Sequence, residues 1–122
     1  MEQQEDRFGA FLKKKRNERT ITVRLMAEMV ELSVGSYCDI ESGRRYPPDR
    51  EMLDKMIGVL NLSETDRTIF YDLAGKARSA APPDLPDYIN ENEMVRLALR
   101  VAKKKASNED WQKFIDELER KE

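Results

Sequence analysis

The stretch Leu32–Arg50, LSVGSYCDIESGRRYPPDR, contains the signals for both ends of one short helix and for the start of another. Ser33 is a residue type that caps helix N-termini, and Gly43 tolerates the left-handed backbone that ends a helix. Two prolines that cannot continue a helix come next, and Asp49 can cap a helix that begins after them. The stretch therefore predicts a helix that ends by Gly43, a loop with two arginines, and a new helix after Asp49.

Apolar residues at helical spacing predict four further helices around this one. Their stripes lie in DRFGAFLKKKRNER, TITVRLMAEMV, REMLDKMIGVL and SETDRTIFYDLAG. In the second segment Thr22 is the expected cap, and the expected buried stripe is Leu25, Met26, Met29 and Val30. In the last segment Ser63 and Asp66 resemble a capping box, and Gly75 is the expected end. No alternation of period two appears, so we expect an all-α fold with a five-helix domain over residues 7–75.

Residues 76–91, KARSAAPPDLPDYINE, hold three of the five prolines and predict an extended linker. Two amphipathic helices follow in residues 92–121, and the second begins with SNED, which again resembles a capping box. Two such short helices cannot bury their apolar faces against each other alone. We expect the faces to pair with a second copy of the chain; docking on the first domain is the alternative. The expected dimer interface consists of Leu97, Val101, Trp111, Phe114, Ile115 and Leu118.

The composition excludes several kinds of chemistry. The 122 residues include no histidine and one cysteine, which rules out a Cys/His zinc site, a Ser-His-Asp triad and an internal disulfide. We therefore expect no metal, no cofactor and no enzymatic activity. Cys38 is interpreted as a small helix residue, with a reactive thiol as the alternative. No apolar run approaches a membrane span and the acidic start MEQQED lacks the features of a secretory signal, so we expect a cytoplasmic protein.

Charge is unevenly distributed along the chain. The formal net charge is −2, yet residues 13–50 contain nine Lys and Arg against six Asp and Glu. Screening over about 8 to 10 Å hides distant charges, so a local basic patch can bind phosphate on a mildly acidic protein. The runs KKKR and GRRY favour such binding, with a solvated helix face as the alternative for KKKR.

The residues on both sides of the turn MVELS are typical of two helices that cross steeply. Ala27 is small where the helices meet, and Val30, Leu32, Tyr37 and Ile40 can share a core. Residues 8–74 resemble the lambdoid repressor, Cro and xenobiotic-response-element (XRE) family of helix-turn-helix DNA-binding domains. The positions that agree are Arg16, Thr22, Ala27, Ser33, Ile40, Glu41, Gly43 and Pro48. The tail resembles, in composition, the dimerising tails of some bacterial members, a biofilm master repressor and a Deinococcus damage-response repressor.

This resemblance implies a role for each matching position. Arg16 and Glu41 would form a structural ion pair, and Ser33 would cap the recognition helix. Base edges in the major groove would face Val34, Gly35, Ser36 and Asp39. DNA phosphates would face Thr22, Arg24, Ser33, Ser42, Arg44, Arg45 and Tyr46.

Several positions depart from the family pattern. The first two residues of the predicted recognition helix supply no side-chain hydrogen bond, so we expect few direct base contacts. Asp39 is expected either to accept from cytosine N4 or to hold one of the two arginines after the helix. Glu31 replaces a turn glycine, Thr20 replaces a glycine after the first helix, and Lys15 replaces an apolar residue. Each departure costs a few tenths to about 1 kcal/mol.

These features predict a sequence-specific transcriptional regulator from a bacterium or phage, a repressor that binds an inverted repeat as a homodimer. The alternative is an antitoxin-type protein, or a degenerate helix-turn-helix that binds protein instead of DNA. Candidate partners of the tail are an anti-repressor, a toxin or a protease, and no membrane is expected as a partner.

Overall fold

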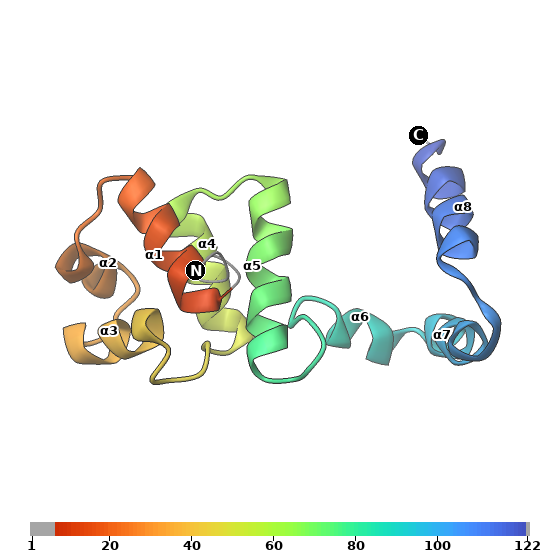
Figure 1. Cartoon of the computed structure of the whole chain (residues 1–122), viewed down its shortest axis with the longest axis horizontal. Coiled ribbons are helices and arrows are strands. Elements are labelled where there is room, and N and C mark those ends of the chain that lie inside the picture. Colours follow the sequence, from red (N-terminus) through yellow and green to blue (C-terminus); the bar gives the residue numbers. More distant parts are fainter. Residues whose placement is uncertain (1–6, 122) are drawn as a thin grey trace. The chain divides into compact units, whose positions relative to one another are not determined.

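The computed structural model describes residues 7–121, and all of its regular elements are helices. They are α1 (Phe8–Glu18), α2 (Val23–Met29), α3 (Val34–Ser42), α4 (Arg50–Leu60), α5 (Glu64–Ala77), α6 (Pro86–Glu91), α7 (Glu93–Lys105) and α8 (Asn108–Glu119) (Figure 1). The prediction of an all-α fold is confirmed. The chain divides after Pro86 into two compact units, which are described separately. The start MEQQED lies outside the described residues, and within them no helix is long and apolar enough to cross a membrane.

Side-chain caps begin most of the helices. In each case an oxygen of the cap accepts a hydrogen bond, at 3.0 to 3.1 Å, from the backbone nitrogen three residues on; the caps are Thr22, Ser33, Asp49, Ser63 and Ser107. At α8 the bond is reciprocal, because the Asp110 carboxylate accepts from the Ser107 nitrogen at 3.0 Å. At α5 the Asp66 carboxylate instead lies 2.8 Å from Lys15 Nζ. The capping box predicted at Ser107 and Asp110 therefore forms. The one predicted at Ser63 and Asp66 does not, because the Asp66 carboxylate binds Lys15 of α1.

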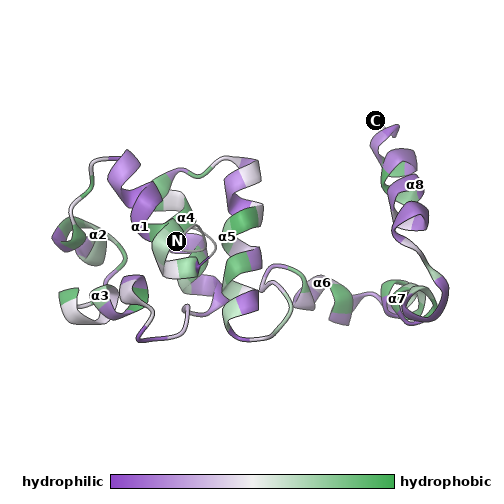
Figure 2. Cartoon of the chain, in the orientation of Figure 1, coloured by the Kyte–Doolittle hydropathy of each residue, from purple (hydrophilic) through white to green (hydrophobic). Residues whose placement is uncertain are grey.

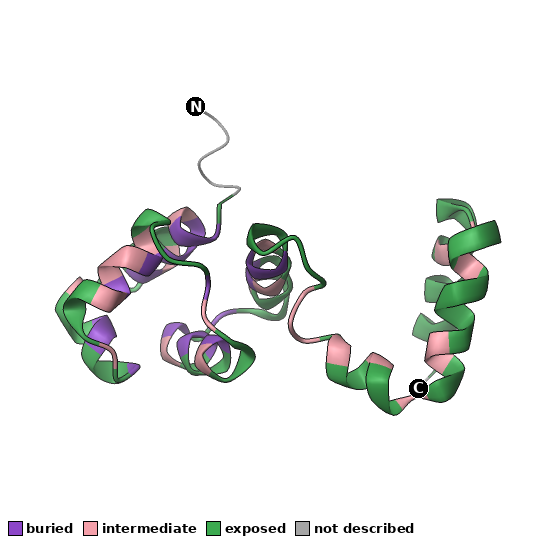
Figure 3. Ribbon diagram, turned by 90° about the horizontal axis from the view of Figure 1, so that it is seen from below, coloured by how far each residue is buried: buried purple, intermediate pink, exposed green. Residues whose placement is uncertain are grey.

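The core of the first unit lies between α1, α2, α3, α4 and α5 (Figure 3). Its buried side chains are Phe8, Phe11, Leu12, Met26, Ala27, Val30, Tyr37, Ile40, Leu53, Met56, Ile57, Leu60, Leu62, Phe70 and Ala74. The predicted stripe of α2 is wrong for Leu25 and Met29, which are 44% and 47% exposed. One residue turns a helix by about 100°, so these two side chains lie beside the buried pair Met26 and Val30 and miss the core.

Helix α5 continues beyond its predicted end at Gly75 to Ala77. Gly75 is buried inside the helix, and a Cβ on it would lie 2.8 Å from backbone atoms of both Ala80 and Ala81. The Ala80 nitrogen also donates to the Gly75 carbonyl at 2.8 Å. This glycine is therefore required by the close return of the chain after the helix, and it does not end the helix.

The segment predicted to be an extended linker contains the six-residue helix α6. Pro86 is its first residue, a position where proline loses no helical hydrogen bond and already has the helical φ. The Arg96 guanidinium donates to the carbonyls of Ile89 and Asn90, and the Asn92 amide donates to the Tyr88 carbonyl at 2.7 Å. These side chains satisfy the carbonyls at the end of α6. No local pattern in the sequence indicates these hydrogen bonds.

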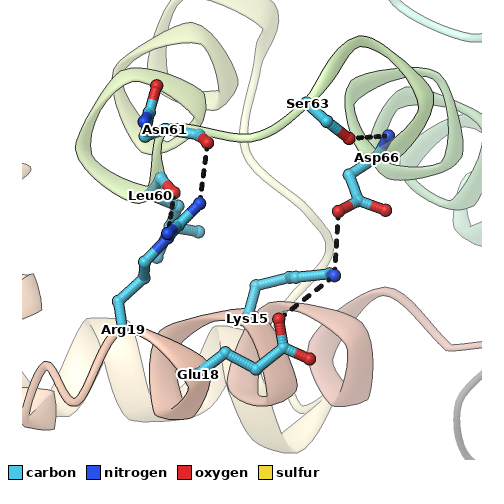
Figure 4. Close-up of polar contacts among 7 residues, drawn as sticks. All are labelled: Lys15, Glu18, Arg19, Leu60, Asn61, Ser63 and Asp66. Carbon is cyan, nitrogen blue, oxygen red and sulfur yellow. Dashed lines mark hydrogen bonds and ion pairs between the residues drawn. The ribbon is translucent and has the colours of Figure 1, made fainter.

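Lys15, which occupies an apolar position of the family pattern, ties α1 to the start of α5 (Figure 4). Its Nζ lies 3.2 Å from Glu18 and 2.8 Å from Asp66, and it lies 5.4 Å from the centre of the Phe11 ring. The hydrogen bond and the charge of Asp66 raise the pKa of Lys15. Nearby, Arg19 donates to the Leu60 carbonyl at 2.7 Å, so polar contacts replace the apolar packing expected here.

Thr20 and Glu31 both adopt the left-handed backbone, with φ of 53° and 63°. These are the two positions where the family pattern has glycine. A left-handed conformation is unfavourable for any residue with a Cβ, and more so for a β-branched one. The strain expected at both positions is therefore present in the structure.

Replacing Thr20 by glycine is expected to raise the free energy of unfolding by about 1 kcal/mol, because glycine adopts a positive φ without strain. Urea unfolding followed by far-UV circular dichroism measures this change. Thr68→Gly is the matched control: Thr68 lies within α5, so the same substitution should there lower stability by about 0.3 kcal/mol. Equal effects at the two positions would contradict the assignment of strain to Thr20.

Candidate DNA interface

Helix α3 is held at both ends and along its inner side. Ser33 caps its first turn, and Gly43, with φ of 86°, ends it. Tyr37 is fully buried and Ile40 is 3% exposed, so one side of the helix belongs to the core. Gly9 of α1 lies so close to the last turn that a Cβ on it would overlap the Glu41 carbonyl oxygen. The position of α3 relative to α1 is therefore set by packing that leaves no room for adjustment.

A buried ion pair joins α1 to the end of α3. Arg16 Nε lies 2.6 Å from Glu41 Oε2, Arg16 Nη2 lies 3.1 Å from Glu41 Oε1, and both side chains are 8% exposed. A third donor, Arg16 Nη1, binds the Ile21 carbonyl at 2.8 Å. The hydrogen bond to Glu41 raises the pKa of Arg16, and burial raises the pKa of the adjacent Tyr37 hydroxyl. Arg16 and Tyr37 therefore both keep their protons near neutral pH.

The four residues predicted to face base edges lie away from the core. Val34 is 40% exposed, Gly35 has open space around its Cα, and Ser36 and Asp39 are half-buried. The Asp39 carboxylate lies 3.2 Å from Arg44 Nε, so it holds the first arginine after the helix. The outer face of α3 therefore presents a methyl-bearing side chain, a bare backbone and few polar groups.

Cys38 is a small residue within α3, as interpreted from the sequence, and it lies on the same side of the helix as Val34. Positions 34, 38 and 42 are four residues apart and so share one side of a helix. The Cys38 side chain is half-buried, and Ser42 at the end of the series is exposed. The spacing of four residues between Val34 and Cys38 is the feature of the sequence that indicates this position of Cys38 on the helix.

The residues predicted to face phosphates lie on α2, α3 and the loop that follows α3. Thr22 and Arg24 are exposed at the start of α2. The Ser33 oxygen accepts from the Ser36 nitrogen, and the Ser42 hydroxyl donates to the Asp39 carbonyl at 3.2 Å, so both hydroxyl groups already have partners in the helix. The Ser33 hydroxyl accepts in that bond, so its hydrogen can still be donated to a phosphate, whereas the Ser42 hydroxyl would have to give up its bond to the Asp39 carbonyl.

The loop after α3 is basic and is braced from α5. The Arg44 side chain is 74% exposed and Tyr46 is 64% exposed. Arg78 lies over the Tyr46 ring at 5.2 Å and donates to the Pro47 carbonyl at 2.7 Å. The Arg45 nitrogen donates to the Asp39 carbonyl at 3.1 Å, which fixes the backbone of the loop to α3.

Two further cations, which the sequence reading missed, lie beside this loop. A pocket of about 400 Å³ is bounded by the start of α1, the loop and the end of α5, and its lining includes Arg7, Arg45 and Lys76. These three residues are far apart in the sequence, so only the fold brings their charges together.

Among residues 7–121, no group of side chains is arranged to hold a metal ion.

The family model of the helix-turn-helix domain matches residues 12–66. These residues form a helix-turn-helix domain of the XRE type. The matched segment includes α2, the turn after it and α3. The helix-turn-helix domain is that of a DNA-binding transcription regulator. No curated protein and no solved structure matches the chain.

The six residues predicted for a dimer interface all lie in the second unit, outside the helix-turn-helix domain. Leu97, Val101, Trp111 and Phe114 line one groove between α7 and α8. Ile115 and Leu118 are 44% and 46% exposed on α8 and do not line that groove.

Proposed function

We propose that this protein is a transcriptional repressor that binds an inverted-repeat operator as a homodimer. The observation that supports the proposal best is the presentation of α3, which is fixed by the Arg16–Glu41 pair and by Gly9 and is followed by a basic loop. A rigid helix of this kind enters the major groove, and the cations beside it neutralise phosphates.

Affinity and specificity come from different parts of this surface. Arg44, Arg45 and the start of α2 supply contacts to the DNA backbone, which carry little sequence information. Val34 packs on a thymine methyl group, and Ser36 serves a donor or an acceptor edge. Since one domain makes few base contacts, two recognition helices about 34 Å apart are needed for a specific site. The dimer then blocks polymerase where it is bound.

Selecting bound sites from a random DNA pool with the full chain tests this proposal directly. The expected result is a common inverted repeat whose half-sites are about 10 base pairs apart, centre to centre. If no common motif emerged and binding did not depend on salt, the protein would belong to the alternative class, an antitoxin or a helix-turn-helix that binds protein.

Replacing Arg45 by alanine is expected to weaken binding to all DNA sequences alike and to reduce the slope of log affinity against log salt by about 1, because one phosphate contact is lost. Arg44→Ala is expected to weaken binding more, since it also leaves the Asp39 carboxylate without its partner at 3.2 Å. Fluorescence anisotropy with the selected operator at several salt concentrations measures both effects. Arg67→Ala, on the exposed side of α5, is the control that should leave the slope unchanged.

A further inference from the structure

The second unit has no buried core of its own. None of the described residues of α6, α7 and α8 is buried, in contrast to the helices of the first unit (Figure 3). Its exposed apolar side chains include Met94 at 74%, Leu97 at 55%, Val101 at 52% and Phe114 at 49%. Contiguous apolar surface of this kind marks an interaction site in a stable protein.

Hydrophobic residues are interspersed with hydrophilic ones along the ribbons of both α7 and α8 (Figure 2). An open groove of about 520 Å³ lies between the two helices. Leu97, Ala98 and Val101 line it from α7, while Trp111 and Phe114 line it from α8 with their rings 6.0 Å apart, edge to face. The two helices of one chain therefore touch and still leave the groove between them unfilled.

The two helices carry opposite charge. Helix α7 has a single carboxylate, Glu93, against the cations Arg96, Arg100, Lys103, Lys104 and Lys105. Helix α8 has a single cation, Lys113, against the carboxylates Glu109, Asp110, Asp116, Glu117 and Glu119. Each helix is thus a poor partner for its own copy and a good partner for the other helix.

We propose that the groove is filled by a second copy of this chain, arranged about a two-fold axis so that α7 of each protomer packs on α8 of its partner. This deepens the homodimer of the proposed function, on which it rests. A two-fold axis makes both cross-pairs at once and closes the assembly. A dimer built from like helices would instead place cation against cation and carboxylate against carboxylate, which is unfavourable.

Charge reversal tests this pairing. The α7-reversed variant carries Arg100→Glu, Lys103→Glu and Lys104→Glu; the α8-reversed variant carries Asp116→Lys, Glu117→Lys and Glu119→Lys. Each alone places like charges across both cross-pairs, so its dimer should dissociate with a constant raised roughly 100-fold or more. Sedimentation equilibrium without DNA measures this against the 14.3 kDa mass of one chain.

Mixing the two variants is the decisive step. The mixture has opposite charges across both cross-pairs again and should form a one-to-one heterodimer. The variant with all six reversals should return to a homodimer. Lys13→Glu with Arg67→Glu, on exposed positions of the first unit, is the control that should stay dimeric. Equal helicity by circular dichroism shows that the variants remain folded.

Three results would overturn the pairing. One is a monomeric wild-type chain, in which the groove is covered by the first unit; another is a single reversal that dimerises like wild type; the third is a mixture that stays monomeric. Because all of these are read without DNA, they are separate from the site selection with wild-type protein. A dimeric wild type that selects no site would overturn the proposed function and leave the pairing intact.

Discussion

Replacing Arg16 by methionine is expected to lower the free energy of unfolding of the first unit by about 3 to 5 kcal/mol. The substitution leaves the Glu41 carboxylate 8% exposed without its bidentate partner and leaves the Ile21 carbonyl without its donor at 2.8 Å. An unpaired buried charge costs far more than the pair contributes, because its desolvation is no longer offset. Methionine keeps much of the length of the side chain, so lost packing adds little.

Urea unfolding followed by far-UV circular dichroism measures this loss. Tryptophan fluorescence is unsuitable, because Trp111 lies in the second unit and does not report on α1 or α3. The double variant Arg16→Met/Glu41→Leu removes both charges and should recover most of the stability. Arg67→Met, on the exposed side of α5, is the control with the same change of side chain. A loss below about 1 kcal/mol for Arg16→Met would mean that the pair does not hold α3 in place.

Replacing Leu97 by aspartate is expected to weaken binding to the selected inverted repeat by about 10²- to 10⁴-fold. Leu97 is 55% exposed and lines the groove between α7 and α8, so the proposed dimer would have to bury a carboxylate there. Without the dimer, each recognition helix binds its half-site independently. Binding to a DNA fragment with one half-site should therefore be unchanged.

Leu99→Asp is the matched control for this prediction. Leu99 is on the same helix and is 38% exposed, but it lies about 200° around the helix from Leu97 and does not line the groove. Fluorescence anisotropy with full and half operators compares the two variants. Equal losses at both positions would point to a damaged helix α7, and no loss at Leu97 would show that operator binding does not require this dimer.

Local signals predicted most of the helices correctly. Caps and terminating glycines act over three or four residues, so Thr22, Ser33, Asp49 and Gly43 could be assigned without knowledge of the fold. Predictions failed where a distant segment decided the outcome. Gly75 resembles a helix end, yet it is a glycine because the chain returns against it.

In the candidate interface, too, some features depend on local sequence and others on contacts between distant segments. The start and end of α3, its buried side and the two arginines after it are properties of one short stretch, and the stretch alone determines them. The contacts that orient this helix join distant residues, such as Arg16 with Glu41 and Gly9 with the Glu41 backbone. Spacing along the chain cannot reveal these contacts, because they exist only once the core has packed.

The sequence by itself therefore determined that a short capped helix would project a sparse polar face next to a basic loop. Tertiary structure decided how that helix is held, that Asp39 is engaged by Arg44, and that α7 and α8 do not bury their apolar faces against each other. The physical reason is range: capping and periodicity act within a turn or two of helix, whereas ion pairs and burial depend on segments that meet only in the folded chain.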